Sequence, residues 1–136
     1  MLAVTSYKVD FVEAQRARVS RQLKAYDALA KAAKPAQVEA FAPEFFENMV
    51  LALDHFFMHR QRSFEGKDGN PLNEVRMLAV SLLDYDGVMT KDNTIKYDPA
   101  KSVTGIGVGQ SIVVTRESFA ALAEGFFREI EAKYPV

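Results

Sequence analysis

The segment "HRQRSFEGKDGNPLNEVR", residues 59–76, decides how the rest of this sequence is interpreted, because it joins two strongly apolar segments through a dense run of charged and amide side chains. Within it, Asn70, Pro71 and Glu74 make a pattern typical of a helix start. The asparagine caps the first turn, the proline occupies the first helical position, and the glutamate lies near the positive end of the helix dipole. The sequence therefore predicts a polar corner followed by a new helix.

Apolar residues recur at helical spacing on both sides of this corner, which predicts an all-α fold. The second helix is apolar around most of its circumference, and Pro43 suits its first turn. We expect one four-helix bundle-like domain over residues 1–136, with a short irregular or β-hairpin insertion at 86–114 before the last helix. The predicted helices cover about residues 7–33, 43–62, 71–85 and 116–134.

Composition excludes several classes of function. The chain has 136 residues, of which 49% are hydrophobic, so one domain with a substantial core is expected. The 17 basic and 18 acidic residues give a net charge of -1, which argues against nucleic-acid and membrane partners. There is no cysteine, no signal-length apolar segment near the N-terminus and no apolar run of spanning length, so we expect a cytoplasmic protein.

Two histidines raise the question of a metal site. His55 and His59 stand four residues apart, so both imidazoles can lie on one side of a helix, and Asp54, Glu47 or a distant carboxylate could add a third ligand. The metalloprotease pattern is absent, because Phe56 follows His55. A polar helix side and a helix end are the more common settings for such histidines. A calcium loop starting at Asp68 fails as well, because the required glutamate is replaced by alanine.

The polar corner also has the composition of an anion site. The first turn of the helix at Pro71 presents unpaired N–H groups, and phosphate or carboxylate would be the ligand class. The alternative is a corner neutralised internally by Glu65, Asp68 and Glu74. The candidate ligand-binding residues are Arg60, Arg62, Lys67, Asn70 and Arg76.

Arg76 is the most informative of these residues, because it lies within the apolar run of the third helix. An enclosed arginine requires a carboxylate partner, since an unpaired buried charge is very costly. Asp54, Glu65 or Glu74 could provide that carboxylate. Such pairing would serve a structural role as readily as a ligand site.

No motif assigns a reaction or a cofactor. The segment "GIGVG", residues 105–109, lacks the last glycine of a dinucleotide fingerprint and the lysine of a phosphate loop. It is interpreted as a turn or flexible arm. No serine or threonine has the local setting of an activated nucleophile. The sequence thus leans away from an enzyme, and no cofactor is implied.

The segments "EFFENMVLALDHFF" and "HRQRSFEGKDGNPLNEVRMLAVSLL", with the later "YDPAKSV" and "TRESF", resemble a family of small conserved hypothetical bacterial proteins, mainly actinobacterial. The resemblance covers roughly the last two thirds of the chain. It implies a bacterial cytoplasmic protein, and it implies nothing about chemistry.

The leading functional hypothesis is a non-enzymatic homodimer in which the second or third helix is covered by its twin, with Phe57 and Met77 at the interface. The alternative is a small-molecule or metal-dependent binding or catalytic site at the His59–Arg76 corner, where Asp54, His55 and Arg60 would converge with Arg76. A third hypothesis assigns partner binding to the 86–114 insertion through an exposed edge.

Overall fold

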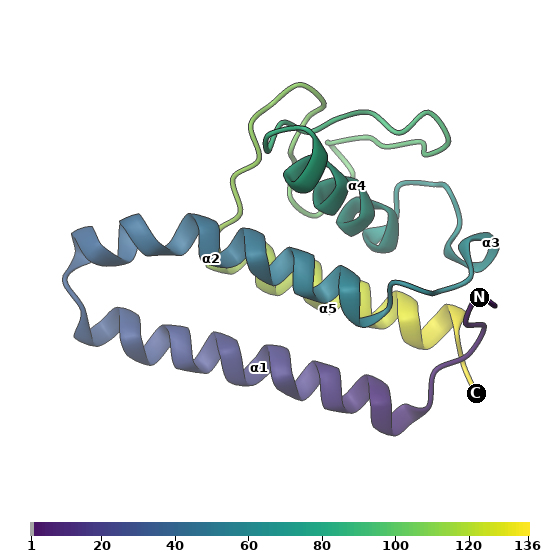
Figure 1. Cartoon of the computed structure of the whole chain (residues 1–136), viewed down its shortest axis with the longest axis horizontal. Helices are drawn as coiled ribbons and strands as arrows, with labels where there is room; N and C mark the ends of the chain where they lie inside the picture. Colours follow the sequence, from purple (N-terminus) through teal and green to yellow (C-terminus); the bar gives the residue numbers. More distant parts are fainter. Residues whose placement is uncertain (1) are drawn as a thin grey trace.

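A computed structural model of the chain describes residues 2–136. The predicted all-α fold is confirmed, because these residues form five helices and no β-strand. Figure 1 shows the three longest helices lying side by side along the long axis of the molecule, with a fourth helix packed across two of them. The helices are α1 (Val9–Ala32), α2 (Pro35–Phe56), α3 (Arg62–Glu65), α4 (Pro71–Asp84) and α5 (Arg116–Lys133).

The chain runs along α1 and returns along α2, and α5 lies against both of these helices. Helix α4 packs on α2 and α5, on the side away from α1. The N-terminal segment, the C-terminus and the segment that follows α2 meet at one end. There, the backbone of Val4 pairs with the segment around Arg60, and the Tyr134 hydroxyl donates to the carbonyl of Gln61 at 2.7 Å.

The predicted bounds of the second helix are wrong at both ends. The helix begins at Pro35, eight residues before the expected start, and Pro43 lies inside it. Pro35 occupies the first-turn position assigned to Pro43, and the residues between the two prolines include three alanines, which favour helix. The helix ends at Phe56 because Arg60 enters the interior and its backbone pairs with Val4, which holds this segment out of helical geometry.

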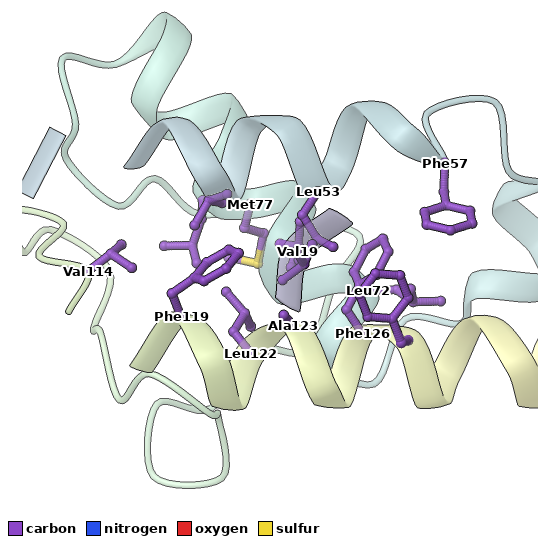
Figure 2. Close-up of a cluster of buried hydrophobic side chains, with 14 of the residues drawn as sticks. Val19, Leu53, Phe57, Leu72, Met77, Val114, Phe119, Leu122, Ala123 and Phe126 are labelled. Atoms are coloured by element: carbon purple, nitrogen blue, oxygen red, sulfur yellow. The ribbon is translucent and has the colours of Figure 1, made fainter. Parts of the chain in front are cut away.

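The core lies between α2, α4 and α5. Figure 2 shows side chains from these helices directed at one another, with Val19 joining from α1 and Val114 from the segment before α5. Phe46, Val50 and Leu53 of α2 have no exposed surface. The same holds for Leu72, Val75 and Leu78 of α4 and for Phe119, Leu122, Phe126 and Ile130 of α5.

This packing corrects the expectation that Phe57 and Met77 are covered by a twin. Phe57 is 1% exposed and Met77 is 3% exposed within a single chain. The Phe57 ring lies 4.9 Å from that of Tyr7 and 5.7 Å from that of Phe126, so the N-terminal segment and α5 of the same chain cover it. The nearly continuous apolar circumference of this helix reflects a central position in the monomer.

The segment 85–115, called the arm, is irregular but anchored. Val88 and Ser111 make one isolated bridge, so the β-hairpin part of the expectation is not confirmed. Apolar side chains spaced along the arm reach the core instead, and their burial offsets the entropy cost of ordering a long loop. The buried anchors are Met89, Ile95, Ile106, Ile112 and Val114. Among residues 2–136, none of the helices has the length and apolar character needed to cross a membrane.

Two glycines with similar positive φ angles test how closely the arm approaches the corner. Gly69 has φ of 85°, and a Cβ there would lie 2.5 Å from the carbonyl oxygen of Lys96; Gly109 has φ of 90° and nothing within 4 Å. Both Gly→Ala variants should lose about 1–2 kcal/mol of unfolding free energy from the left-handed backbone. Gly69→Ala should lose about 1–3 kcal/mol more from the clash. Urea denaturation measures both losses, and equal losses would contradict the close approach.

Candidate functional site

The polar corner is organised around the carboxylate of Glu65, which has no exposed surface. One oxygen accepts a hydrogen bond from Arg60 Nε at 2.9 Å and another from Arg76 Nη2 at 2.7 Å. The second oxygen accepts from Asn73 Nδ2 at 2.7 Å. Arg76 Nε also lies 3.1 Å from this second oxygen. Of the three carboxylates that the sequence offers to Arg76, Glu65 is therefore its partner.

Arg60 is a structural residue, because its guanidinium is used entirely within the protein. It is 2% exposed. Besides Glu65, it contacts Asp54 Oδ1 at 3.3 Å and donates to the carbonyls of Phe57 and Leu72 at 3.1 and 3.3 Å. The guanidinium also stacks over the Phe126 ring at 5.4 Å. Arg60 thus has no donor directed at an external ligand.

The electrostatics of Glu65 follow from this enclosure. Burial alone would raise the pKa of its carboxyl, but the hydrogen bond from Arg76 and the charges of Arg60 and Arg76 outweigh burial, so the pKa is lowered from the usual 4.5. The carboxylate is accordingly the form that the folded protein stabilises.

The loop before α4 is held by the backbone carbonyl of the same residue, Glu65. Asn70 caps α4 by accepting from the backbone N–H groups of Leu72 and Asn73 at 2.9 and 3.3 Å. Its amide nitrogen donates to the Glu65 carbonyl at 2.8 Å, and Lys133 Nζ of α5 donates to that carbonyl at 2.9 Å. The predicted role of Asn70 as a helix cap is confirmed. The loop therefore joins α3, α4 and the end of α5.

A second buried carboxylate holds the arm. Glu74 has no exposed surface. It accepts from the backbone N–H of Val103 at 2.9 Å, and from the N–H and hydroxyl of Thr104 at 2.9 and 2.6 Å. The sequence predicts Glu74 as a partner of the helix dipole and an internal counter-charge. In the structure its carboxylate accepts hydrogen bonds from N–H and O–H donors of the arm.

The structure does not bring the five candidate anion ligands together. Arg60 is enclosed, and Arg62 and Arg76 line a surface cleft. Lys67 is exposed on the loop, where its backbone carbonyl accepts from Lys96 N at 2.8 Å. Asn70 uses its side chain within the cap.

The metal candidates are separated as well. Asp54 pairs with Arg60, whereas His55 and His59 are exposed. Across residues 2–136, no group of three or more histidine, aspartate and glutamate side chains is placed to hold a metal ion. The i, i+4 spacing of the histidines is interrupted because α2 ends at Phe56, between them.

The cleft beside Arg62 and Arg76 has a volume of about 260 Å³. Lys91 of the arm supplies a third cation, and Asp92 lies next to it. Met77, Val80 and Tyr85 form its apolar wall. Sequence reasoning missed Lys91, because nothing local indicates that the arm folds back over α4.

A different surface lies where α1 passes into α2. A groove of about 200 Å³ is lined there by Tyr26, Leu29, Ala30, Ala33, Val38 and Phe41, together with one polar residue, Gln37. Leu29 is 57% exposed and Phe41 is 49% exposed. Phe41 was missed as a site residue because the second helix was predicted to start after it. We call this surface the α1–α2 tip.

Comparison with known proteins adds no relative, since no family model, curated protein or solved structure matches this chain. The two surfaces must be interpreted from their own geometry.

Replacing Glu65 by glutamine tests the buried network. The variant keeps the shape but removes the charge that balances Arg60 and Arg76, so unfolding free energy at pH 7 should fall by about 3 kcal/mol. Because the folded-state pKa is lowered, the contribution of Glu65 is present above the ordinary carboxyl pKa of 4.5 and is lost as pH falls through the folded value. The loss of wild-type stability below about pH 4.5 should therefore be shallower in Glu65→Gln. Thermal unfolding from pH 7 to pH 3 measures both effects.

The matched control is Glu124→Gln, which removes an exposed carboxylate paired with Arg128 on α5. This variant should change stability by less than about 1 kcal/mol at pH 7. Similar losses in the two variants would contradict the central role of Glu65.

Glu74→Gln should loosen the arm. The amide group places N–H donors where the arm presents its own donors, so at least one of the bonds to Val103 and Thr104 is lost. Amide hydrogen exchange at residues 103–106 should accelerate at least tenfold, while amides in the middle of α5 keep their protection. Unchanged exchange at 103–106 would show that the apolar anchors alone hold the arm.

Proposed function

We propose that this chain is a non-enzymatic interaction protein that forms a homodimer through the α1–α2 tip. The single observation that carries this proposal is an apolar groove left without an intramolecular partner. Arg116, the first residue of α5, pairs with Asp27 of α1 at 2.8 and 3.0 Å. The last turn of α1 therefore extends beyond the start of α5, as Figure 1 also shows.

The exposed surface at the tip is chemically suited to a protein contact. Aromatic side chains are already aligned there, with the Phe41 and Phe45 rings stacked at 5.1 Å and the Phe45 and Tyr26 rings stacked at 5.8 Å. A row of preordered aromatic rings loses little side-chain entropy on binding, and aromatic residues are enriched where interfaces gain most of their energy.

Charge favours a second copy as the partner. The α1 half of the α1–α2 hairpin carries Lys24, Lys31 and Lys34, whereas the α2 half carries Glu39, Glu44 and Glu47. None of these six side chains makes a salt bridge within residues 2–136. In a two-fold arrangement α1 of one copy faces α2 of the other, so opposite charges meet twice.

Glu47 supports this arrangement. Partial burial and the neighbouring Glu44 raise the pKa of its carboxyl, so the isolated chain leaves an acidic pair without compensation. The facing lysines of a second copy would relieve that repulsion.

The wider setting follows from the sequence. The resemblance to small actinobacterial proteins and the lack of cysteine support a bacterial cytoplasmic dimer of bundle-like helical domains.

A second function, the binding of a small anion, is favoured by the cationic cleft between Arg62, Arg76 and Lys91. Arg62 of this cleft begins α3, which lies at the end of the molecule opposite the turn between α1 and α2 (Figure 1).

Leu29→Glu should dissociate the dimer, because a carboxylate would be desolvated inside an apolar interface. Sedimentation velocity across a concentration series should show a dimer for the wild type and a monomer for the variant. Leu83→Glu is the matched control, because Leu83 is 69% exposed but lies on α4, away from the tip. It should leave the dimer intact. Dissociation by Leu83→Glu alone would move the interface to α4, and a wild type that stays monomeric at millimolar concentration would end the proposal.

Charge reversal tests whether the partner is a second copy. Changing the three lysines of the α1 half to glutamate should weaken dimerisation at least tenfold, and changing the three glutamates of the α2 half to lysine should do the same. Combining both sets restores opposite charges across a two-fold interface, so the dissociation constant should return toward the wild-type value. Failure of the combined variant to recover would contradict the two-fold pairing of α1 with α2 of the second copy.

A further inference from the structure

We propose that the cleft between α3, α4 and the arm binds a small organic oxyanion, with a phosphate or carboxylate head held by Arg62, Arg76 and Lys91 and an apolar body resting on α4. This site is independent of dimerisation at the α1–α2 tip. Its three cations come from elements separated in sequence, and they line one cleft of about 260 Å³.

Arg76 is prepared for this role by the buried network. Its Nε and Nη2 atoms are fixed on the Glu65 carboxylate at 2.7 to 3.2 Å. No hydrogen bond within residues 2–136 uses its Nη1 atom, and its side chain is 20% exposed in the cleft. A guanidinium held along one edge by a carboxylate presents its remaining donors without further loss of side-chain entropy.

The charge balance of the cleft leaves a positive excess. Arg60 and Arg76 are matched by Asp54 and Glu65. Arg62 and Lys91 make no salt bridge within residues 2–136, and Asp92 is the acidic side chain that lines the cleft with them. Two cations against one anion leave one positive charge available to a ligand.

Asp92 does not neutralise both free cations of the cleft. One of its oxygens is used locally, accepting from the backbone N–H of Thr94 at 2.8 Å and from the Thr94 hydroxyl at 2.7 Å. These bonds, together with the charges of Arg62 and Arg76, lower the pKa of Asp92, so its carboxylate senses the same cations without forming a salt bridge to them. An oxyanion that approaches these cations meets one competing charge.

The apolar residues that line the cleft favour a ligand with an organic body. Met77, Val80 and Tyr85 come from α4 and the residue that ends it. Val80, which lies within α4, is 44% exposed, and Tyr85, which follows the last residue of α4, is 50% exposed. Small-ligand sites combine such apolar walls with a few convergent polar groups. A bare inorganic anion would use only the cationic side.

The position of the cleft is fixed by the fold. The Ser81 hydroxyl accepts from the backbone N–H of Thr90 at 3.0 Å, which holds the start of the arm against α4. Met89 is buried to 1% exposure, so Lys91 follows two anchored residues. The third cation is therefore placed by packing of the arm and needs no ligand to bring it to the cleft.

Titration of the 136-residue chain with phenyl phosphate at low ionic strength tests the proposal, with amide chemical-shift changes and calorimetry as readouts. We expect one saturable site, with the largest shifts at Thr90, Lys91 and Arg76. Arg62→Gln and Lys91→Gln should each weaken binding about tenfold, the effect of one charge-assisted hydrogen bond. Lys101→Gln, an exposed lysine outside the cleft, should change affinity less than twofold.

A second pair of variants tests whether the apolar residues of the cleft contribute to binding, apart from any effect on folding. Val80→Glu places a carboxylate in the cleft and should reduce binding more than tenfold, whereas Leu83→Glu makes the same charge change outside it and should not. Inorganic phosphate should bind more weakly than phenyl phosphate, and benzoate reports whether a carboxylate head suffices. Thermal melts confirm that each variant is folded. The proposal would be overturned if neither aromatic anion showed saturable binding, or if Arg62→Gln, Lys91→Gln and wild type bound with equal affinity. Neither outcome would bear on the proposed dimer.

Discussion

The fold depends on the burial of the Glu65 carboxylate between two arginines. Arg60 comes from the segment after α2, Arg76 comes from α4, and Lys133 of α5 binds the backbone carbonyl of the same glutamate. A buried ion network adds little net stability, because desolvation offsets much of the attraction. Its effect is on geometry. Any alternative packing that separates these partners leaves an uncompensated charge in the interior, so the ends of α2, α4 and α5 can meet in one way only.

Local sequence patterns predicted the features that local interactions determine. The cap at Asn70, the start of α4 at Pro71 and the extent of the last helix all follow from short-range signals. The need of Arg76 for a carboxylate was also predictable, because the cost of an unpaired charge depends only on its being enclosed. The start of α2 was not, since Pro35 and Pro43 both satisfy the rule for a first turn and a proline can also lie inside a helix at a cost.

The candidate sites were predictable only in part, because each depends on contacts between distant segments. The corner was identified by its composition, but composition does not say which cations face inward. Arg60 is enclosed, whereas Arg62, two residues later, faces the cleft. Lys91 joins that cleft only because Ser81 and the buried anchors hold the arm against α4. No period or motif in the arm reports this placement.

The tip is exposed because α1 and α2 are longer than α5, and the helices are aligned at the opposite end of the molecule, where the Glu65 network lies. Helices α1 and α2 contain 24 and 22 residues, whereas α5 contains 18 and α4 contains 14. At 1.5 Å per residue, α1 exceeds α5 by about 9 Å. The Tyr7 N–H, just before α1, donates to the Tyr134 carbonyl at the end of α5 at 3.0 Å, so α1 and α5 are level at the Glu65 end and the difference accumulates at the other end, where Leu29 and Phe41 are exposed. The interaction that closes one end of the molecule thereby leaves the other end open to a partner.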